Sequence, residues 1–236
     1  MEPVFPEGSF PGYVEALKKV SAAIASDLYL EDILKLIVTV TAEVMQSKIM
    51  SLMLLDEKGL QLIIRATQSV SEDYNKKPPL RVGEGIAGKV VATNKPIAVD
   101  DVRKEVEYKY KNIAEREALC SLLCVPLSVK GRAIGVINSY TSVPHHFTRT
   151  EIDMLTSVAH QAAISIENTE LLVQTKVIQE ELQARKMIER AKDILVKRLD
   201  ISGEEAYKRI QKRSMNIRRP MKEIAEAIVL ASEIEK

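Results

Sequence analysis

The chain has 236 residues, of which 46% are hydrophobic and 28% charged, and its formal net charge is +1. This composition is typical of a globular protein, and the length suits one large domain or one ordinary domain plus a small one. Trp is absent and aromatic residues amount to only 4%. That content disfavours a carbohydrate cleft or a platform that stacks single-stranded bases, since both depend on aromatic rings.

The N-terminus and the cysteine content predict a cytoplasmic protein. Met1-Glu2-Pro3 opens the chain without a basic stretch and a following apolar run, so we expect no secretory signal. The most apolar segment, Ile49 to Leu55, is too short to cross a bilayer, and we expect no membrane partner. Two cysteines suit a reducing compartment.

Charge is distributed unevenly along the chain. Lys and Arg outnumber Asp and Glu from Gln183 to the C-terminus, whereas acidic residues are in excess before Gln183. Such asymmetry suggests that the C-terminal end meets a polyanion. A basic face that only contacts solvent is the alternative, and charge alone does not separate the two.

The N-terminal half predicts helices and antiparallel hairpins. Residues 13–47 have the periodicity of two helices. An apolar strand at Ile49 to Leu55 and a second strand at Leu60 to Ala66 flank a turn, and so predict a hairpin. A second hairpin is predicted from Leu119 to Val129 and Ala133 to Tyr140.

Between these hairpins, the sequence predicts a helix at Ile86 to Thr93 and a short strand at Ile97 to Val99. Antiparallel strands with helices gathered at the ends indicate an α+β fold.

A long helix follows, without Gly or Pro from residue 148 to residue 202. Thr148 and Glu151 have the spacing of a capping box at its start. Apolar residues then recur at heptad spacing, and Asn168 and Thr175 lie between them. We interpret this segment as a parallel two-stranded coiled coil that joins two copies of the chain, in which the buried polar residues set the register. A single solvent-exposed connector helix in a monomer is the alternative.

The C-terminal segment predicts a small all-α domain of three helices. The first is the end of the long helix, which should stop near Leu199-Asp200. The second opens with Ser202 and Glu205 as a capping box, and the third has Pro220 as its first residue. About fifty residues make a thin core, at the lower limit for independent folding.

Residues 1–166 resemble a GAF domain. The resemblance rests on Val82-Gly83-Glu84-Gly85-Ile86-Ala87-Gly88, Lys95-Pro96-Ile97 and Val99-Asp100-Asp101-Val102, then on Cys124-Val125-Pro126-Leu127, Ile134-Gly135-Val136-Ile137 and Phe147-Thr148. It implies an antiparallel sheet flanked by helices, with the glycines where the chain turns tightly into a helix over the sheet. It also implies a sensory role.

A GAF domain usually encloses a small molecule, so the resemblance implies an effector whose identity the sequence does not give. Asn94-Lys95 is present, but the Phe with a following Asp-Glu of cyclic-nucleotide-binding members is absent. No cofactor can be identified. By position, the candidate ligand-binding residues are Val99, Asp100, Asp101, Tyr108, Tyr110, Cys120 and Leu122.

No enzyme or metal site is predicted. Cys120 and Cys124 lie four residues apart on a predicted strand, so they face the same way but stand too far apart for an unstrained disulfide. A redox switch or a thiol enzyme, as in GAF-like methionine sulfoxide reductases, is one reading of these cysteines. Packing as small apolar residues is the other. The three histidines lack partners at metal-ligand spacing.

Residues 183–236 resemble an ANTAR domain, the RNA-binding output module of antitermination regulators, and residues 167–182 form the helical linker that precedes it. The resemblance rests on Arg185, Ile188-Glu189-Arg190-Ala191-Lys192-Asp193-Ile194-Leu195, Ile201-Ser202-Gly203-Glu204-Glu205-Ala206-Tyr207, Ser214-Met215 and Met221-Lys222-Glu223-Ile224-Ala225. The chain departs from the family pattern at Asp193, Val196 and Pro220, none of which removes a basic group.

The resemblance implies that RNA stem-loops of leader transcripts are the partner, bound by Arg and Lys side chains. The candidate RNA-binding residues are Arg185, Lys186, Arg190, Lys192, Arg198, Arg209, Lys212, Arg213, Arg218, Arg219 and Lys222. The sequence thus predicts a signal-responsive antitermination regulator and a homodimer. A DNA-binding regulator with a helix-turn-helix, a GAF-type thiol enzyme and a scaffold that only dimerises remain as alternatives.

Overall fold

The computed structural model describes residues 30–234 and divides the chain into two compact units, Met1–Thr169 and Glu170–Lys236. Of the two helices predicted between residues 13 and 47, the second is α2 (Leu30–Val44). The first lies outside the described residues.

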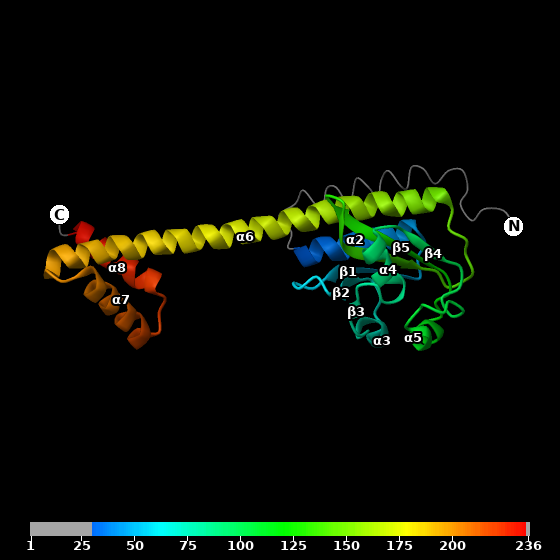
Figure 1. Cartoon of the computed structure of the whole chain (residues 1–236), viewed down its shortest axis with the longest axis horizontal. Helices are drawn as coiled ribbons and strands as arrows, with labels where there is room; N and C mark the ends of the chain where they lie inside the picture. The colour runs from blue at the N-terminus through cyan, green and yellow to red at the C-terminus, as the bar shows by residue number, and fades with distance from the viewer. Residues whose placement is uncertain (1–29, 235–236) are drawn as a thin grey trace. The chain divides into compact units, whose positions relative to one another are not determined.

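The N-terminal unit is built on a six-stranded antiparallel sheet with the strand order β3-β2-β1-β6-β5-β4 (Figure 1). Its strands are β1 (Ile49–Leu55), β2 (Gln61–Thr67), β3 (Leu80–Arg81), β4 (Ile97–Val99), β5 (Leu122–Val129) and β6 (Arg132–Tyr140). The β1–β2 and β5–β6 hairpins predicted from sequence are confirmed. The two hairpins join through β1 and β6, where Ile49 lies opposite Tyr140.

The central strands are buried on both faces of the sheet. In β1, Met50 and Leu52 pack against one face and Ile49 and Met53 against the other. This explains why β1 is apolar at every position except Ser51 and does not alternate between apolar and polar residues. The sheet therefore has two cores, one on each side.

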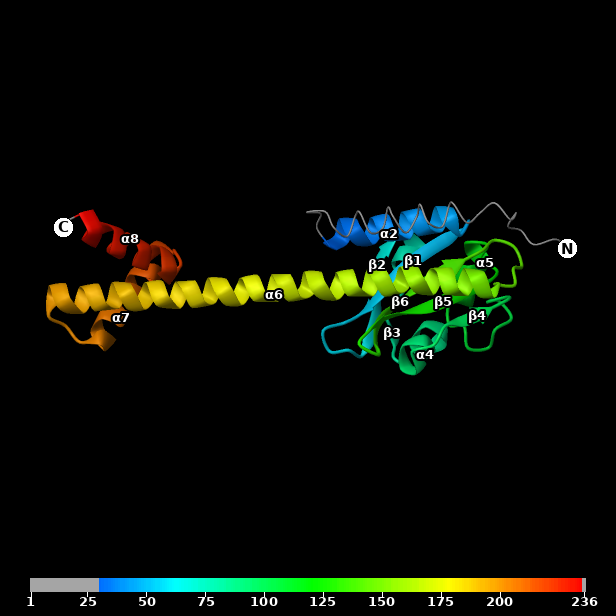
Figure 2. The same cartoon turned by 90° about the horizontal axis from the view of Figure 1, so that it is seen from above.

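Two long helices cover the first face. Figure 2 shows α2 beside the N-terminal part of α6 (Arg149–Leu199), with the sheet behind both. Ile33, Leu34 and Ile37 of α2 belong to the same buried cluster as Leu155 and Ile166 of α6. Their spacing of three and four residues places one apolar stripe of each helix on the sheet.

Short helices and loops cover the second face. They are α3 (Glu72–Asn75), α4 (Gly85–Thr93) and α5 (Lys111–Arg116), with the loop from residue 100 to residue 110. Tyr74 of α3, Ile86 and Val90 of α4 and Ala114 of α5 pack in one cluster with Leu122 of β5. This irregular layer leaves room for a cavity between its segments and the sheet.

Close packing of the backbone explains why Gly88, in the first turn of α4, is a glycine. A Cβ at this position would lie 2.4 Å from the carbonyl oxygen of Arg81 and 3.0 Å from the backbone nitrogen of Gly83. Only glycine lets the first turn of α4 approach the backbone that precedes it so closely.

Helix α6 runs without a break from Arg149 to Leu199, as its lack of Gly and Pro predicts. The capping box at its start is confirmed. The Glu151 backbone N–H donates to Thr148 Oγ1 (3.3 Å), and the Thr148 N–H donates to the Glu151 carboxylate (2.6 Å). Glu151 is almost fully buried and also contacts His145 Nε2 at 2.8 Å. Residues of α6 contribute to the buried cores of both units.

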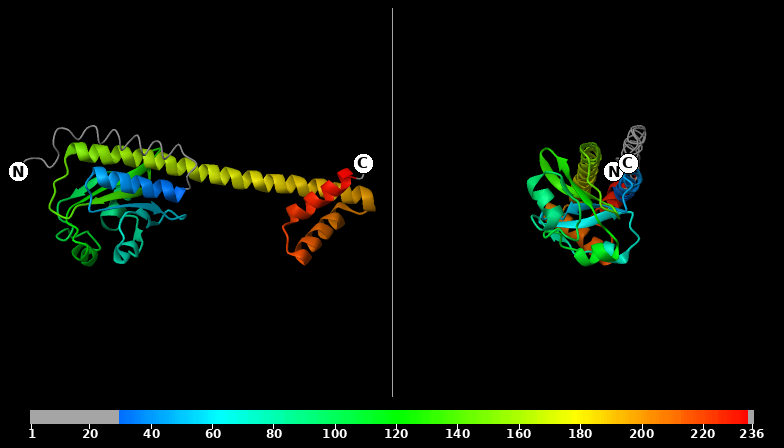
Figure 3. Two further views of the ribbon diagram at one scale, coloured as in Figure 1. Left: turned by 180° about the vertical axis from the view of Figure 1, so that it is seen from behind. Right: turned by 90° about the vertical axis from the view of Figure 1, so that its right-hand side faces the viewer.

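The C-terminal unit is the predicted three-helix domain. Helices α7 (Gly203–Ile217) and α8 (Met221–Ile234) pack on the C-terminal end of α6 (Figure 3). The small core contains Ala191 of α6, Ile210 of α7 and Ala225 of α8. Ser202 caps α7 by accepting a hydrogen bond from the Glu205 N–H (3.1 Å), whereas the Glu205 carboxylate pairs with Arg209. Pro220 precedes the first residue of α8.

The sequence reasoning missed β3, α3 and α5, each of which has six residues or fewer. It also began β5 three residues too early. The Leu119 N–H donates to the Ala114 carbonyl (2.7 Å) and so closes α5, and Ala118 adopts a left-handed conformation. Within residues 30–234, no helix is both long and apolar enough to cross a membrane.

Candidate functional site

A small cavity of about 20 Å³ lies in the second face of the N-terminal unit. It opens between the sheet and the segments around α3, α4 and α5, and its volume suits roughly one water molecule. Its apolar walls are Met53, Ile64, Leu80, Ile86, Ala87 and Leu122; its other lining residues are Tyr74, Lys77, Gly85, Tyr108, Lys109, Tyr110, Asn138 and Tyr140.

Four tyrosines dominate the polar part of this lining, and their hydroxyls are bonded within the protein. Tyr74 shares a hydrogen bond with Ser51 (2.8 Å), and Tyr110 donates to the Pro78 carbonyl (2.6 Å). Tyr108 donates to the hydroxyl of Tyr140 (3.3 Å). Burial raises the pKa of Tyr108 to about 12, so the tyrosines stay neutral at physiological pH.

Lys77 is the cation at the centre of this tyrosine cluster. Its ammonium nitrogen lies 3.6 Å from the ring centroid of Tyr74, 5.4 Å from that of Tyr140 and 5.5 Å from that of Tyr110. These distances are within the range of cation–π attraction. Burial nevertheless lowers the pKa of Lys77 to about 7, and the charge of Glu117 opposes that shift. We name Lys77 with Tyr74, Tyr110 and Tyr140 the lysine–tyrosine cluster.

Replacing Lys77 by Met should stabilise the N-terminal unit at slightly acidic pH. The pKa of Lys77 is lower in the folded chain than the ordinary value of about 10.4, so the unfolded chain binds more protons between pH 7 and pH 10. The stability of the wild type therefore rises with pH in that window, and this contribution is absent from the variant. We expect a gain of about 1–3 kcal/mol for Lys77→Met at pH 6.5 after allowance for solvent screening, shrinking toward pH 9.5. Urea unfolding of both proteins at the two pH values measures this gain in the free energy of unfolding. A gain that does not depend on pH would contradict the role given to the Lys77 charge.

The structure places three of the predicted ligand residues in the cavity wall, namely Tyr108, Tyr110 and Leu122. Val99 is buried in the core of the same face, while Asp100, Asp101 and Cys120 lie away from the cavity. Three of the seven predicted residues thus line the cavity and four do not, and ligand binding by any of them stays a prediction.

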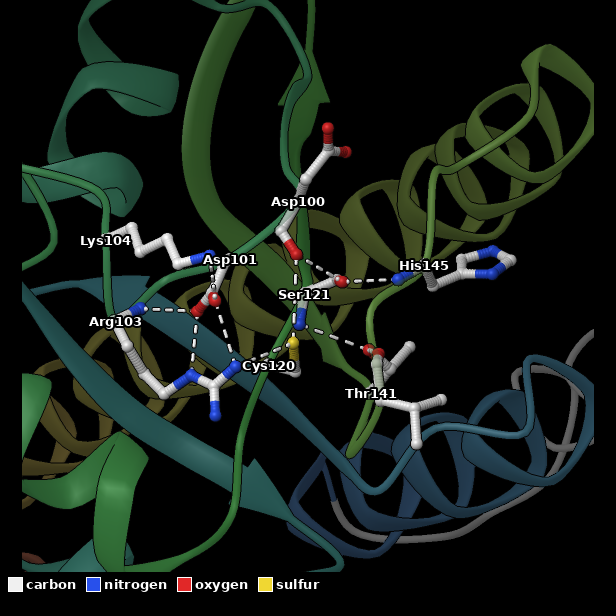
Figure 4. A network of polar contacts seen from close by, with 9 residues as sticks. Asp100, Asp101, Arg103, Lys104, Cys120, Ser121, Thr141 and His145 are labelled. Carbon is white, nitrogen blue, oxygen red and sulfur yellow. Dashed lines mark hydrogen bonds and ion pairs between the residues drawn. The ribbon is translucent and has the colours of Figure 1, made fainter.

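That network ties the end of β4 to β5 and to the loop after β6 (Figure 4). The Arg103 guanidinium makes two hydrogen bonds to Asp101 (2.8 and 2.9 Å), which hold the pKa of this carboxyl at about 2. Arg103 also donates to Cys120 Sγ (3.3 Å). Ser121 Oγ donates to the Asp100 carbonyl (2.7 Å) and accepts from the His145 backbone N–H (2.8 Å). These contacts fix loops around the sheet edge.

Both cysteines are free and buried. Cys124 packs in the core of the second face, and its burial raises the pKa of its thiol. Cys120 is 1% exposed. A nucleophilic thiol needs solvent access and thiolate character, so the packing role is the better supported one. No group of three or more His, Cys, Asp or Glu side chains is arranged to hold a metal within residues 30–234.

Sequence reasoning missed Tyr74, Lys77, Asn138 and Tyr140, although all four line the cavity. Tyr140 and Asn138 stand on a strand that was predicted, and alternation places both on the face of Leu122. Lys77 and Tyr74 come from α3 and the turn after it, which have no periodicity. Four of the seven tyrosines line one cavity, but no sequence signal marked that convergence.

The predicted RNA-binding residues lie on all three helices of the C-terminal unit. Nine of the eleven are exposed, and Lys192 and Lys222 are half-buried. Five make ion pairs with carboxylates of the same unit: Arg190 with Glu233, Lys192 with Glu189, Arg209 with Glu205, Arg219 with Glu223 and Lys222 with Glu226.

The remaining basic groups include five with no carboxylate at ion-pair distance among the described residues. They are Arg185 and Lys186 on α6, Lys212 and Arg213 on α7, and Arg218 at the left-handed C-cap of α7. We name these five the unpaired basic set. A lysine or arginine that has no acidic neighbour attracts a phosphate more strongly than one whose charge is already compensated. Tyr207 on α7 is also exposed, at 42%, and offers a ring for base stacking.

Comparison with protein families decides the classification of both units. The family model described as GAF domain matches residues 28–167. The chain belongs to the GAF domain family. The family model described as ANTAR domain matches residues 176–229. The order of the two matches agrees with the resemblances given by the sequence, and the ANTAR match begins within the segment 167–182 that was predicted as the linker.

One relative matches this chain at low identity. The nitrogen fixation protein AnfA of Azotobacter vinelandii is 24% identical over 154 residues, which are 64% of this chain and 29% of AnfA. The chain thus spans less than a third of that relative.

Solved structures agree with this assignment. The GAF domain of a phosphoenolpyruvate-protein phosphotransferase from Coxiella burnetii aligns with a TM-score of 0.64 at 23% identity, covering 71% of this chain and 99% of its own. Free methionine-R-sulfoxide reductase from Neisseria meningitidis, solved with its substrate, aligns with a TM-score of 0.60 at 20% identity, covering 73% and 99%.

The chain therefore carries a sensory GAF domain followed by an ANTAR domain, which is the architecture of a signal-responsive regulator. Both are regulatory domains, although some proteins that share the GAF fold are enzymes. The lysine–tyrosine cluster belongs to the GAF domain and the unpaired basic set to the ANTAR domain.

Proposed function

We propose that this protein is a transcription antitermination regulator of the cytoplasm. In this proposal, the GAF domain senses a small molecule, and the ANTAR domains of a homodimer bind RNA stem-loops in leader transcripts. The observation that carries it is the unpaired basic set on an ANTAR domain whose first helix, α6, is also the last helix of the GAF core. A ligand that binds one arrangement of the chain better than another would shift the population of the RNA-binding arrangement.

The test of RNA binding is a competition between an RNA with two adjacent hairpins and a duplex DNA of equal length. We expect the full chain to prefer the RNA by at least about tenfold. The logarithm of its affinity should fall with the logarithm of salt concentration, with a slope of about −0.7 per phosphate contact. Preference for the duplex would favour a DNA-binding regulator. Weak binding that does not respond to salt would favour a scaffold that only dimerises.

The homodimer is supported by an exposed heptad stripe on α6. Ile164, Leu171 and Ile178 repeat every seven residues, and Asn168, Thr175 and Leu182 form the parallel row four residues on. Leu171 is 49% exposed and Ile178 is 64% exposed in a single chain. Two such stripes would bury each other in a parallel coiled coil, and an Asn in the row favours a fixed register.

The double substitution Leu171→Asp with Ile178→Asp should convert the dimer to a monomer. Four carboxylates would replace four buried apolar side chains per dimer, so we expect the dissociation constant to rise by at least about 1000-fold. Sedimentation equilibrium measures the change. Val173→Asp is the matched control, since Val173 is exposed on α6 two residues from Leu171 and outside both rows. A wild type that sediments as a monomer with and without RNA would contradict the dimer.

A thiol enzyme is the weaker candidate because Cys120 and Cys124 are both buried. A turnover assay on free methionine sulfoxide with the wild type and with Cys120→Ser would reveal such an activity.

A further inference from the structure

The lysine–tyrosine cluster is an unusual place for a lysine ammonium. A lysine next to a turn normally extends its charged end into water. Lys77 is the second residue after α3, is half-buried, and instead directs its ammonium over the face of the Tyr74 ring. The cation therefore faces the cavity of the GAF domain.

No carboxylate of residues 30–234 neutralises this cation by direct contact. Among the described residues, Lys77 makes no ion pair, and the charge that acts on it most is that of Glu117 at the end of α5. That carboxylate already accepts a hydrogen bond from Ser71 Oγ. A half-buried cation that lies over neutral rings and makes no ion pair among the described residues lacks the compensation that buried charges require.

The cavity wall favours an anion over a cation as the missing partner. Its described lining residues include Lys77 and Lys109 but neither Asp nor Glu. Lys109 is paired with Glu84, so its charge is already compensated. A cationic ligand over the tyrosine rings would compete with the Lys77 ammonium for the same space. An anion would instead pair with the Lys77 ammonium.

Resting on the proposed sensory function, we propose that the GAF cavity binds a small carboxylate with an apolar body. Its carboxylate pairs with the Lys77 ammonium, and its apolar body packs among Leu80, Ile86 and Leu122. The cavity of about 20 Å³ holds only about one water molecule. Lys77 and the turn that carries it must therefore move outward on binding, and this displacement is how the ligand favours one arrangement of the chain.

Binding should be coupled to proton uptake. Burial lowers the pKa of Lys77 to about 7, and a bound carboxylate would raise it again. The rings near the Lys77 ammonium are those of Tyr74 on α3, Tyr110 at the start of α5 and Tyr140 on β6, which remain neutral over this range. The charge of Glu117, after α5, also acts on Lys77 and opposes the lowering of its pKa. Because only the charged lysine attracts an anion, the dissociation constant should be about 30-fold larger at pH 8.5 than at pH 6.

Three probes of matched shape test the proposal on the full chain: butyrate, butan-1-ol and butylammonium. The chain has no Trp, and four of its seven tyrosines line the cavity. Tyrosine fluorescence therefore responds to binding there, and calorimetry gives the affinity. We expect butyrate to bind with a dissociation constant on the order of 1 mM at pH 6, to weaken with rising pH, and to bind best of the three.

Two variants locate the site. Lys77→Met should abolish butyrate binding, whereas Lys76→Met should retain it, since Lys76 is exposed, is paired with Glu72 and does not line the cavity. Lys77→Arg should still bind butyrate, but its dissociation constant should no longer depend on pH. The pH dependence of the dissociation constant of the wild type tests the proposal without any variant. Preferential binding of butylammonium, or no butyrate binding at about 10 mM, would overturn the proposal. Either result would leave RNA-hairpin binding and its salt dependence intact, so the failure of this ligand class is distinguishable from the failure of the proposed function.

Discussion

Gly135→Ala should destabilise the GAF domain by about 3 kcal/mol or more. Gly135 lies on β6 opposite Leu54 of β1 and Leu127 of β5. A Cβ there would stand 2.1 Å from the carbonyl oxygen of Met53 and 3.0 Å from the Cα of Leu54. These are backbone atoms at the centre of the sheet, so no side chain can rotate away and the two strands must separate. Urea unfolding followed by far-ultraviolet circular dichroism measures the loss.

Gly203→Ala is the matched control for this substitution. Gly203 is the first residue of α7, and a Cβ there would meet only the flexible end of the Lys192 side chain, at 3.8 Å. The added methyl group should leave the GAF transition unchanged and alter the stability of the ANTAR domain by less than about 1 kcal/mol. Equal losses of stability from the two substitutions would contradict the steric clash that we infer at Gly135.

Reversing two charges of the unpaired basic set should weaken hairpin RNA binding on the order of 100-fold at about 100 mM salt. The double substitution is Lys212→Glu with Arg213→Glu, both on the exposed surface of α7. It removes two phosphate contacts and adds two repulsive charges. The salt slope should become shallower by about 1.4, because each lost contact contributes about 0.7. Fluorescence anisotropy over a range of salt concentrations gives both quantities.

Lys208→Glu with Arg209→Glu changes the net charge by the same amount on the same helix. These two side chains are already paired with Glu204 and Glu205, so we expect a loss smaller than tenfold. If both double variants lose affinity equally, long-range charge rather than a local surface controls binding.

The sequence predicted the regular elements well because each has a strong local signal. The capping residues Thr148 and Ser202 and the apolar runs of β1 and β5 depend on neighbours that are close in the chain, and the structure confirms them. The short elements β3, α3 and α5 were not predicted because tertiary contacts hold them in place and their sequences have no periodicity.

The cavity was less predictable because it is assembled from distant segments. Tyr108, Tyr110 and Leu122 were reached through their places in the GAF-like pattern, but Lys77 has no feature that separates it from the adjacent Lys76. Lys76 pairs with Glu72 at the surface, whereas Lys77 turns inward. That difference arises from side-chain packing alone. In the ANTAR domain, sequence located the basic residues, but only the ion pairs separate Lys212 from Arg209.

Native mass spectrometry of the full chain with an RNA of two adjacent hairpins tests the central claim most directly. The account predicts a complex of two chains with one RNA, and its loss on Lys212→Glu with Arg213→Glu. The same spectrum would reveal a small molecule retained by the GAF domain. Free RNA beside free protein, under conditions in which the chain is folded, would contradict the claim that this regulator acts by binding RNA.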